Sequence, residues 1–365
     1  MIDIEGLIKV LKHIQLSFIY LLFLDICKVM KKIFDYHIGI DVSKLTLDVT
    51  VLFEYKNRTK TEYCKIENNA KRIAQFVKKL LARCGSGQVL FCFENTGIYS
   101  LPIAYYLYEN KLSYWQVPAI EIKRSKGITR GKSDKIDSKD IAFYAYTHTH
   151  KYRPGMMPAK SIQQLRLLFT EREKVLKALA LFERTAENRN FVQKDVFKAV
   201  ESVNKSVIHK LKQTMKCLEE KMLAIIASED NLSLQYRLLT SIPGIGMQTA
   251  IYIIHATKGF ESFDNWRQLA CYAGVAPFPN TSGTGIRGRT KVHPLADKKL
   301  KSLLNMCAMT AIRYDKELKA YYGRKVKEGK PKMLVINNVR CKLLARVFAV
   351  MNRQTPFINT FKFAS

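Results

Sequence analysis

The sequence predicts a mixed α/β domain followed by a mainly helical half, and three observations carry this prediction. From His37 to about Val117, segments typical of strands alternate with segments of helical periodicity. From Ser161 to about Ser228 the period is helical throughout, without glycine or proline. Beyond it, a segment rich in Gly, Pro, Ser and Thr separates further helices. A chain of 365 residues is long enough for several domains. We expect four parts, at residues 1–34, 35–155, 156–230 and 231–365.

The first domain is expected to open with three strands and a helix. The run "HIGIDVSKLTLDVTVLF" alternates and is rich in β-branched residues, which predicts two strands with a tight turn at Ser43 and Lys44. The run "TKTEYCKI" is expected to form a third strand. The segment "NNAKRIAQFVKKLLARC" predicts a helix that begins at the potential caps Asn68 and Asn69 and ends before Gly85.

Further strands and helices are expected to complete this domain. The run "QVLFCFENTG" is typical of a buried strand that ends in a turn. The segment "SLPIAYYLYEN" predicts a helix, "SYWQVPA" a short strand and "DSKDIAFYAYTH" another helix. Such an order indicates a mixed sheet covered by helices.

The middle of the chain predicts a long helical hairpin. Apolar residues recur at helical spacing among charges, at Leu165, Leu168, Val175, Leu179 and Leu181. One interpretation is a coiled coil that holds two subunits together. The alternative is a helical linker within one chain, and the sequence does not separate the two.

Three further features mark the last part. The run "SIPGIGMQTA" predicts two helices joined by a turn at Gly244 and Gly246. It is typical of a helix-hairpin-helix element that offers backbone N–H groups to a DNA phosphate, and the alternative is a tight turn between packed helices. A polar loop is expected between Ala276 and Pro294, and a basic helical tail from Tyr321 to Arg353.

The composition favours a polyanionic partner. The chain has 61 Lys plus Arg against 31 Asp plus Glu, a formal net charge of +30, which points first to nucleic acid. Its 8 cysteines form no CxxC pair, and its 7 histidines are not clustered. We therefore expect reduced thiols in a bacterial cytoplasmic protein rather than disulfides or a zinc site.

The first residues do not fit this pattern. The run "IQLSFIYLLFLDICKVM" is apolar, but Asp25 interrupts it and it is short for a membrane span. It lacks a small-residue cleavage site, which speaks against a signal peptide. Since "MKKIFDYHIGIDVSK" reads like a natural start, Met1 and Met30 both remain candidates for the first residue.

Four acids stand where a catalytic site would be expected. Asp41 lies in the apolar run "IGIDVS", and Glu94 ends the buried run "VLFCFE". Ligands of α/β sheets gather at such strand ends. Asp134 and Asp137 are three residues apart, which on a helix places both on one face. They lie in a basic stretch that we expect to bind nucleic acid through Lys123, Arg124, Lys126, Arg130 and Lys132.

Carboxylates in this number predict binding of a hard cation. Oxygen ligands suit magnesium, and two such ions can clamp a phosphodiester that is being cleaved. The alternative for each acid is a helix cap or a pair with lysine. Two nearby acids are not expected to take part, since Asp48 is interpreted as an exposed strand residue and Asp140 as lying on the solvated side of its helix.

The polar loop offers a nucleophile. Ser282 lies between Thr281 and Gly283, near Arg287, Arg289 and Lys291. Arginines could stabilise charge at a phosphoryl centre. The alternative is a flexible loop that only contacts phosphates.

Several of these motifs occur together in one known family. In order along the chain they are "IGIDVSK", "FENTGIY", "KSDKIDSKDIA", "IPGIG", "YAGVAPFPNTSGTGIRGR" and "YYGRKVKEGKPKMLVINNVRCKLLARVF". From about His37 to Gln354 the chain resembles the DEDD transposases of bacterial insertion sequences, which include Piv-type DNA invertases.

The resemblance implies a RuvC-like, RNase H-type N-terminal domain with Asp41, Glu94, Asp134 and Asp137 as its acids. It also implies a helical coiled-coil linker, and a mostly helical C-terminal domain in which Ser282 is the nucleophile. It further implies recombination guided by a structured RNA, by dimers that pair into tetramers. Two alternatives remain open: a RuvC-like nuclease or junction resolvase that uses water, and an inactive DNA-binding remnant.

Overall fold

The computed structural model describes residues 34–95, 97–126, 133–185, 190–282 and 286–359. The chain divides into two compact units, Met1–Met157 and Pro158–Ser365. The apolar run before Met30 therefore lies outside the described residues. Among the residues described, no helix is both long and apolar enough to cross a membrane.

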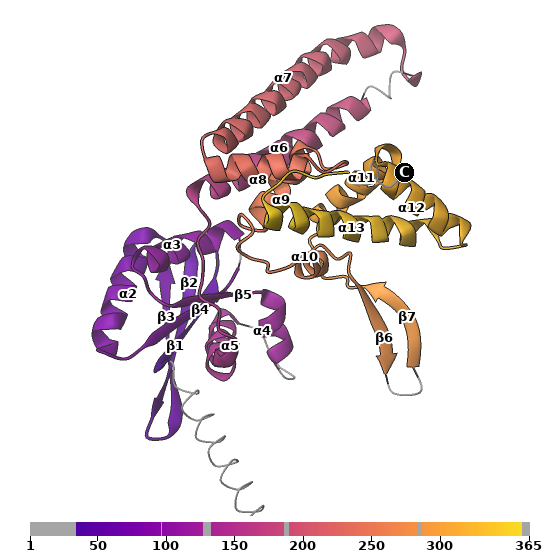
Figure 1. Ribbon diagram of the computed structural model, residues 1–365. Helices are drawn as coiled ribbons and strands as arrows, with labels where there is room; N and C mark the ends of the chain where they lie inside the picture. The colour runs from indigo at the N-terminus through magenta and orange to yellow at the C-terminus, as the bar shows by residue number, and fades with distance from the viewer. Residues whose placement is uncertain (1–33, 96, 127–132, 186–189, 283–285, 360–365) are drawn as a thin grey trace, which may run out of the picture. The chain divides into compact units, whose positions relative to one another are not determined.

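The first unit is built on a five-stranded mixed sheet (Figure 1). Its strand order is β3-β2-β1-β4-β5; β1, β2 and β3 are antiparallel neighbours, while β1, β4 and β5 run parallel. This order and these directions are those of an RNase H-type sheet, as the family resemblance implies. The strands are β1 (Tyr36–Val42), β2 (Thr46–Tyr55), β3 (Arg58–Glu67), β4 (Val89–Glu94) and β5 (Tyr114–Val117).

Helices cover both faces of this sheet. Ile38 and Ile40 of β1 pack with α2 and α3 on one face, whereas Leu90 and Cys92 of β4 pack with α4 and α5 on the other. The expected cap of α2 is confirmed, since the side chain of Asn69 accepts from the N–H of Arg72. The helices are α2 (Ala70–Cys84), α3 (Leu101–Glu109), α4 (Ala119–Ser125) and α5 (Asp134–Thr147), with short 3₁₀ turns at Gly97–Ser100 and Thr149–Lys151.

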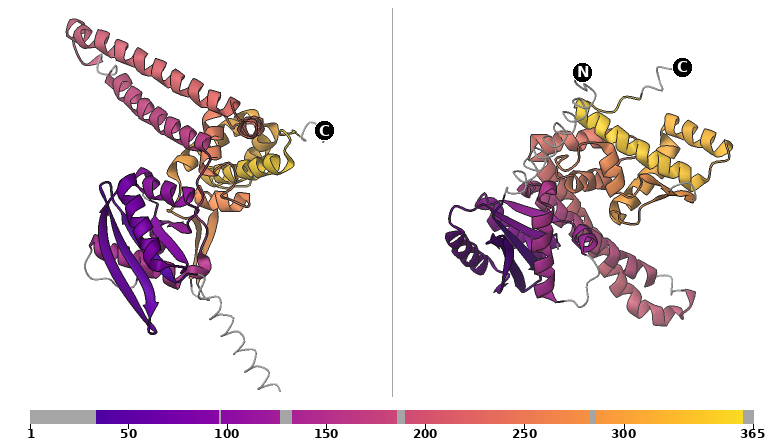
Figure 2. Two further views of the ribbon diagram at one scale, coloured as in Figure 1. Left: turned by 90° about the vertical axis from the view of Figure 1, so that its left-hand side faces the viewer. Right: turned by 90° about the horizontal axis from the view of Figure 1, so that it is seen from below.

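The second unit begins with the expected helical hairpin. Helices α6 (Lys160–Thr185) and α7 (Lys194–Ala227) lie side by side in both views of Figure 2. Ion pairs join them, with Arg172 2.7 Å from Glu219 and Lys212 3.1 Å from Glu183.

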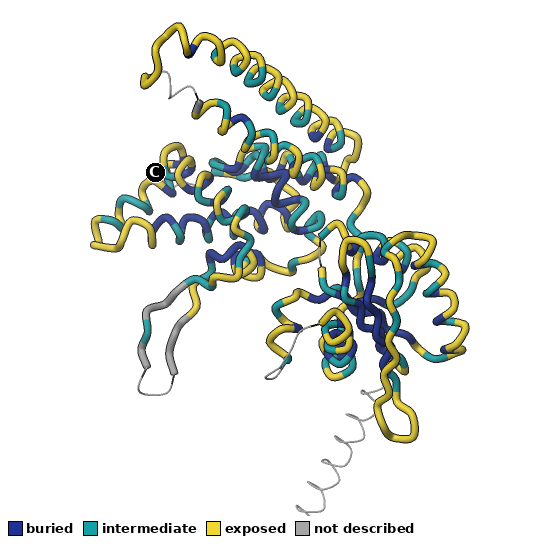
Figure 3. Tube along the Cα trace, turned by 180° about the vertical axis from the view of Figure 1, so that it is seen from behind, coloured by how far each residue is buried: buried dark blue, intermediate teal, exposed yellow. Residues whose placement is uncertain are grey.

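The apolar residues of this hairpin are largely used within the chain. Leu165 is fully buried, Leu179 is 5% exposed, and Leu168 packs on the core of the second unit. Only Leu181 of the expected stripe is well exposed. Figure 3 shows instead that much of α7 is exposed, so a second subunit would have to use other residues than Leu168 and Leu179.

The rest of the second unit is mainly helical around one core that also includes the base of the hairpin. The free thiols agree with expectation, since every cysteine in the described part of the chain is unpaired. The helices are α8 (Asp230–Thr240), α9 (Met247–Ala256), α10 (Trp266–Tyr272), α11 (Lys298–Tyr314), α12 (Lys316–Lys327) and α13 (Lys332–Arg353).

One prediction for this unit is wrong. The segment between Ala276 and Pro294 was expected to be a loop, but it forms a two-stranded hairpin of β6 (Pro277–Ser282) and β7 (Ile286–Val292). Glycine, proline and small polar residues hide the strands, because they lack the β-branched and aromatic residues by which strands are recognised. Thr281 pairs with Arg287 and Ser282 with Ile286.

Candidate functional site

The ends of two parallel strands bring Asp41 and Glu94 together. Strands β1 and β4 pair in a register that places Ile40 beside Phe93. The next residues along the two strands are Asp41 and Glu94, and neighbouring positions of parallel strands present their side chains to the same face. Both acids therefore belong to the carboxyl edge of the sheet, on the face that α5 covers.

Helix α5 is seated on this face by direct backbone contact with β1. A Cβ atom added at Gly39 would lie 2.2 Å from the carbonyl oxygen of Ser138 and 2.2 Å from the nitrogen of Ala142, so only glycine fits there. Nearby, the hydroxyls of Thr50 and Ser138 form a buried hydrogen bond of 2.8 Å. These residues place the beginning of α5 next to Asp41, and the sequence analysis missed them. The signal it could have used was a glycine inside an apolar strand, which often marks close backbone approach.

The first turn of α5 carries the other two acids. Ser133 caps the helix, its hydroxyl accepting from the N–H of Ile136 at 3.3 Å. Asp134 and Asp137 follow in the first turn, where the helix dipole favours negative charge. The prediction that both lie on one helical turn is confirmed.

The charges of these acids act on one another. Burial, followed by the charges of Asp137, Asp134, Glu94 and Asp48, raises the pKa of Asp41 to about 6. Carboxylates raise one another's pKa only when they lie close together with little water between them. All four predicted acids are therefore brought into one neighbourhood.

A fifth acid belongs to this neighbourhood, contrary to expectation. Asp48 is not exposed: its side chain is 2% exposed and lies opposite Asp41 in the β1–β2 register. The hydroxyl of Tyr63 donates to Asp48, and the ammonium of Lys65 lies 3.1 Å from it. The expectation failed because Asp48 shares the face of Asp41, which α5 and the long side chains of β3 cover.

Asp140 is also more involved than expected. It is only 24% exposed rather than fully solvated, and its carboxylate lies 3.0 Å from the ammonium of Lys126. The same ammonium lies 2.7 Å from Asp137. Lys126, which we expected to contact nucleic acid, is thus bound to two carboxylates of α5 in this structure.

The donor set fits a hard divalent cation. Asp41, Glu94, Asp134 and Asp137 offer only carboxylate oxygens, which suit magnesium, and burial together with the charges of the other three acids raises the pKa of Asp41. In their present positions, no three acid, histidine or cysteine side chains of the described residues meet closely enough to hold an ion. Lysines supply the positive charge instead.

The remaining basic residues of the expected site are placed unequally. Lys123 and Arg124 are exposed on the last turn of α4, whereas Arg130 and Lys132 lie outside the described residues. Ser282 is the last residue of β6. Strand β7 carries Arg287, Arg289 and Lys291, and for these three and Ser282 the structure describes the backbone alone.

The turn between α8 and α9 has the expected helix–turn–helix form. Gly244 has a φ of +96°, and a Cβ atom there would lie 2.7 Å from the carbonyl oxygen of Cys307 in α11. This glycine is therefore required by packing within the chain rather than by a partner. Gly246 has open space around it and is exposed at the beginning of α9, where the helix offers free N–H groups.

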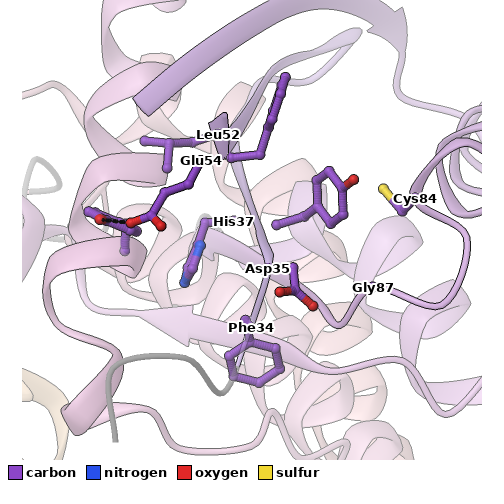
Figure 4. Close-up of a pocket in the computed structure, with 10 residues that line it drawn as sticks. Phe34, Asp35, His37, Leu52, Glu54, Cys84 and Gly87 are labelled. Carbon is purple, nitrogen blue, oxygen red and sulfur yellow. Dashed lines mark hydrogen bonds between the residues drawn. The ribbon is translucent and has the colours of Figure 1, made fainter. Parts of the chain in front are cut away.

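A separate cavity lies at the start of β1 (Figure 4). Its volume is about 240 Å³, and His37 lies in it between Glu54 and Asp35. Burial lowers the pKa of His37 to about 4, although Glu54 and Asp35 act in the opposite direction. The acids lie at the opposite end of β1.

Sequence comparisons define the class of the protein. Residues 38–188 match the DEDD transposase model of IS110-type elements, and residues 236–323 match the model described as the transposase IS116/IS110/IS902 family. Together the two matches cover more than half of the chain; the first extends from the first structural unit into the helical hairpin, and the second lies in the second unit. The chain belongs to the IS110-type DEDD transposases, and so to the DNA recombinase and transposase enzymes.

Individual relatives agree with this assignment. The pilin gene-inverting proteins of Moraxella lacunata and Moraxella bovis are each 27% identical over 88% of this chain and 97% of their own length. An uncharacterised protein of insertion element IS110 from Streptomyces coelicolor is 29% identical over 32% of this chain and 29% of its own length. The RuvC structure of Thermus thermophilus covers 32% of this chain and 98% of its own, with 14% identity and a TM-score of 0.25.

Proposed function

We propose that this protein cleaves and rejoins DNA at the ends of an insertion sequence, and so moves or inverts the element. The observation that supports this most is the placement of Asp41 and Glu94 at the carboxyl ends of β1 and β4, on the face covered by α5, whose first turn carries Asp134 and Asp137; these are the four acids that the family resemblance names. The net charge of +30 supplies the attraction to a polyanion.

The four acids are assigned the binding of magnesium, as two ions. When bound, such ions polarise the scissile phosphate and stabilise the charge that develops on it. The acids hold this charge at a fixed place, because β1, β4 and α5 join through backbone contacts. Lys123 and Arg124 are exposed and are assigned to the DNA backbone, together with Arg130, Lys132, Arg287, Arg289 and Lys291.

Ser282 is assigned the nucleophile. Its oxygen forms a bond to phosphorus while the bond between phosphorus and the departing strand oxygen breaks, and the hydroxyl proton ends on the departing strand. The bonds formed and broken are both phosphoesters, so the strand can be rejoined without an energy source. Ser282 needs help to lose its proton, which the acid site of the same or a neighbouring subunit would provide.

The family resemblance adds the partners. We assign the protein a structured RNA encoded by the element as guide, and a homodimer that pairs into a tetramer with DNA. The turn at Gly244 and Gly246 is assigned a phosphate contact through the beginning of α9, because Gly246 is exposed and has open space around it.

The test is a search for protein covalently linked to DNA. The full chain is incubated with element-end DNA, guide RNA and magnesium, denatured, and run on a denaturing gel. Wild type should give an adduct, Ser282→Ala should bind DNA without forming one, and Ser228→Ala, at the exposed end of α7, should behave as wild type. Metal-dependent cleavage without an adduct would make water the nucleophile and the protein a resolvase-like nuclease. Binding without cleavage would indicate an inactive remnant.

A further inference from the structure

One lysine is shared between two acids of α5, only one of which belongs to the proposed metal site. The ammonium of Lys126 lies 2.7 Å from Asp137 and 3.0 Å from Asp140. The three side chains are 20%, 23% and 24% exposed, so water screens this cluster less than it screens a surface pair. The ammonium donates a hydrogen bond to Asp137, and its contact with Asp140 is an ion pair.

The position of Lys126 is fixed by the helix that precedes it. Lys126 caps the carboxyl end of α4, its N–H donating to the carbonyl of Ile122. Ile122 is fully buried against α5, and the hydroxyl of Tyr144 in α5 donates to Glu121 at 2.8 Å. The packing of α4 on α5 therefore holds the backbone of Lys126 beside α5.

The other acid in the first turn of α5, Asp134, also lies near a lysine that contacts a further acid. Lys65 lies 3.1 Å from the buried Asp48 and 3.9 Å from Asp134. Each proposed metal ligand on α5 thus shares a lysine with an acid outside the proposed ligand set, which is Asp48 in one case and Asp140 in the other.

We propose that Lys126 is the counter-cation of the acid site when no metal ion is bound. Asp140 is a positioning residue, which keeps the ammonium of Lys126 in place when Asp137 binds a metal ion instead. Lys65 and Asp48 act in the same way on Asp134, more weakly because that side of the site is more exposed. The inference rests on the proposed function, since it takes the four acids as the metal site.

The physical reason is competition for one carboxylate. Asp137 needs a positive partner to offset the neighbouring acids, and Lys126 provides it in the absence of metal. A metal ion that uses Asp137 must displace the ammonium. With Asp140 beside it, the displaced ammonium keeps a carboxylate partner 3.0 Å away, so displacement costs less than it would without Asp140.

The test measures manganese binding to the full chain by titration calorimetry, with thermal unfolding in the presence and absence of the ion as a second readout. Lys126→Met removes the competitor and should tighten binding about fivefold, the upper end for one ion pair of this kind. It should also lower the midpoint of unfolding without metal, so that manganese raises this midpoint by more than in wild type. Lys126→Arg, which keeps the charge, should bind as wild type, and so should Lys198→Met, which breaks only the exposed pair with Asp195.

Asp140→Asn completes a double-mutant cycle. It should weaken manganese binding clearly when Lys126 is present and much less in the Lys126→Met chain, because the retained lysine is then gone. Equal weakening in both backgrounds, or no tightening in Lys126→Met, would overturn the proposal while leaving the metal site intact. If wild type binds no manganese, or Asp137→Asn binds it as well as wild type does, the assignment of the metal site fails with it.

Discussion

Asp41 and Asp48 face each other across the β1–β2 pair, on the face of the sheet that α5 covers. The first is half-buried beside three further acids, and the second is buried with Tyr63 and Lys65 as partners. Two carboxylates in directly opposite positions are destabilising unless something compensates them. Tyr63 and Lys65 offset the charge of Asp48, whereas burial and the neighbouring acids raise the pKa of Asp41 to about 6.

Replacing Asp41 by Asn should stabilise the metal-free protein and abolish recombination. The pKa of Asp41 is raised to about 6, so ionised Asp41 opposes folding above that pH, and this cost disappears as the pH falls towards its ordinary value. At pH 8 the gain in the free energy of unfolding should be on the order of 1 kcal/mol. Urea unfolding at pH 8 and pH 4 measures it, and an equal gain at both would contradict the electrostatic reason. Magnesium should stabilise wild type more than the variant.

Replacing Gly39 by Ala should separate α5 from the sheet. The added methyl group would meet backbone atoms at Ser138 and Ala142, which cannot move without shifting the helix. We expect a loss of about 3 kcal/mol in the free energy of unfolding, at the high end for overpacking, together with loss of cleavage. The control is Ala119→Gly, at the exposed start of α4. Gly85→Ala is not suitable, because Gly85 has a positive φ.

The two glycines of the α8–α9 turn should respond differently to alanine. At Gly244 the φ of +96° and the contact with Cys307 predict a loss of about 3 kcal/mol in stability. At Gly246 there is open space and a negative φ, so stability should change by less than about 0.5 kcal/mol. Chemical unfolding measures both. If Gly246→Ala folds normally and binds DNA as tightly as wild type, the phosphate contact proposed for this turn does not require glycine at this position.

Buried His37 and partly buried His255 should make the protein sensitive to acid. Burial lowers the pKa of His37 and of His255 to about 4, so the neutral ring is favoured in the folded state. The stability that each neutral ring contributes is fully present above the ordinary histidine pKa of 6.5. It is lost as the pH falls from 6.5 through about 4, and the loss in the free energy of unfolding reaches about 3 kcal/mol for each histidine. His37→Gln should flatten the dependence of stability on pH in that window. His209→Gln, exposed on α7, should leave the profile as it is.

Association through the helical hairpin should depend on α7. Val196, Val200 and Val203 follow helical spacing and are 62%, 49% and 61% exposed, which gives a second subunit an apolar stripe to cover. Glutamate at Val196 and Val203 together should convert the proposed dimer to monomer in sedimentation. Glutamate at Lys198 and Lys205, on the opposite side of the helix, is the matched control. A dimer that survives the valine changes would place the interface elsewhere.

The sequence was most informative where structure is decided locally. Alternation located β1 and β2, the capping rule located the start of α2 at Asn69, and the spacing of Asp134 and Asp137 gave their common face. Burial of Asp48 could not be deduced in this way, because it depends on what a distant helix covers. The strands beside Ser282 were missed because their composition is that of a loop. The partners of Lys126 were missed because charge along the sequence does not say which acid a lysine meets.

The contact at Gly39 limits how this protein can diverge. Because backbone meets backbone there, the distance between β1 and α5 does not depend on the size of any side chain. Substitutions elsewhere in the core can accumulate without changing the spacing between the acid on the strand and the acids on the helix. A cluster of acids whose spacing is set by the main chain tolerates such substitutions at the cost of one position that cannot vary.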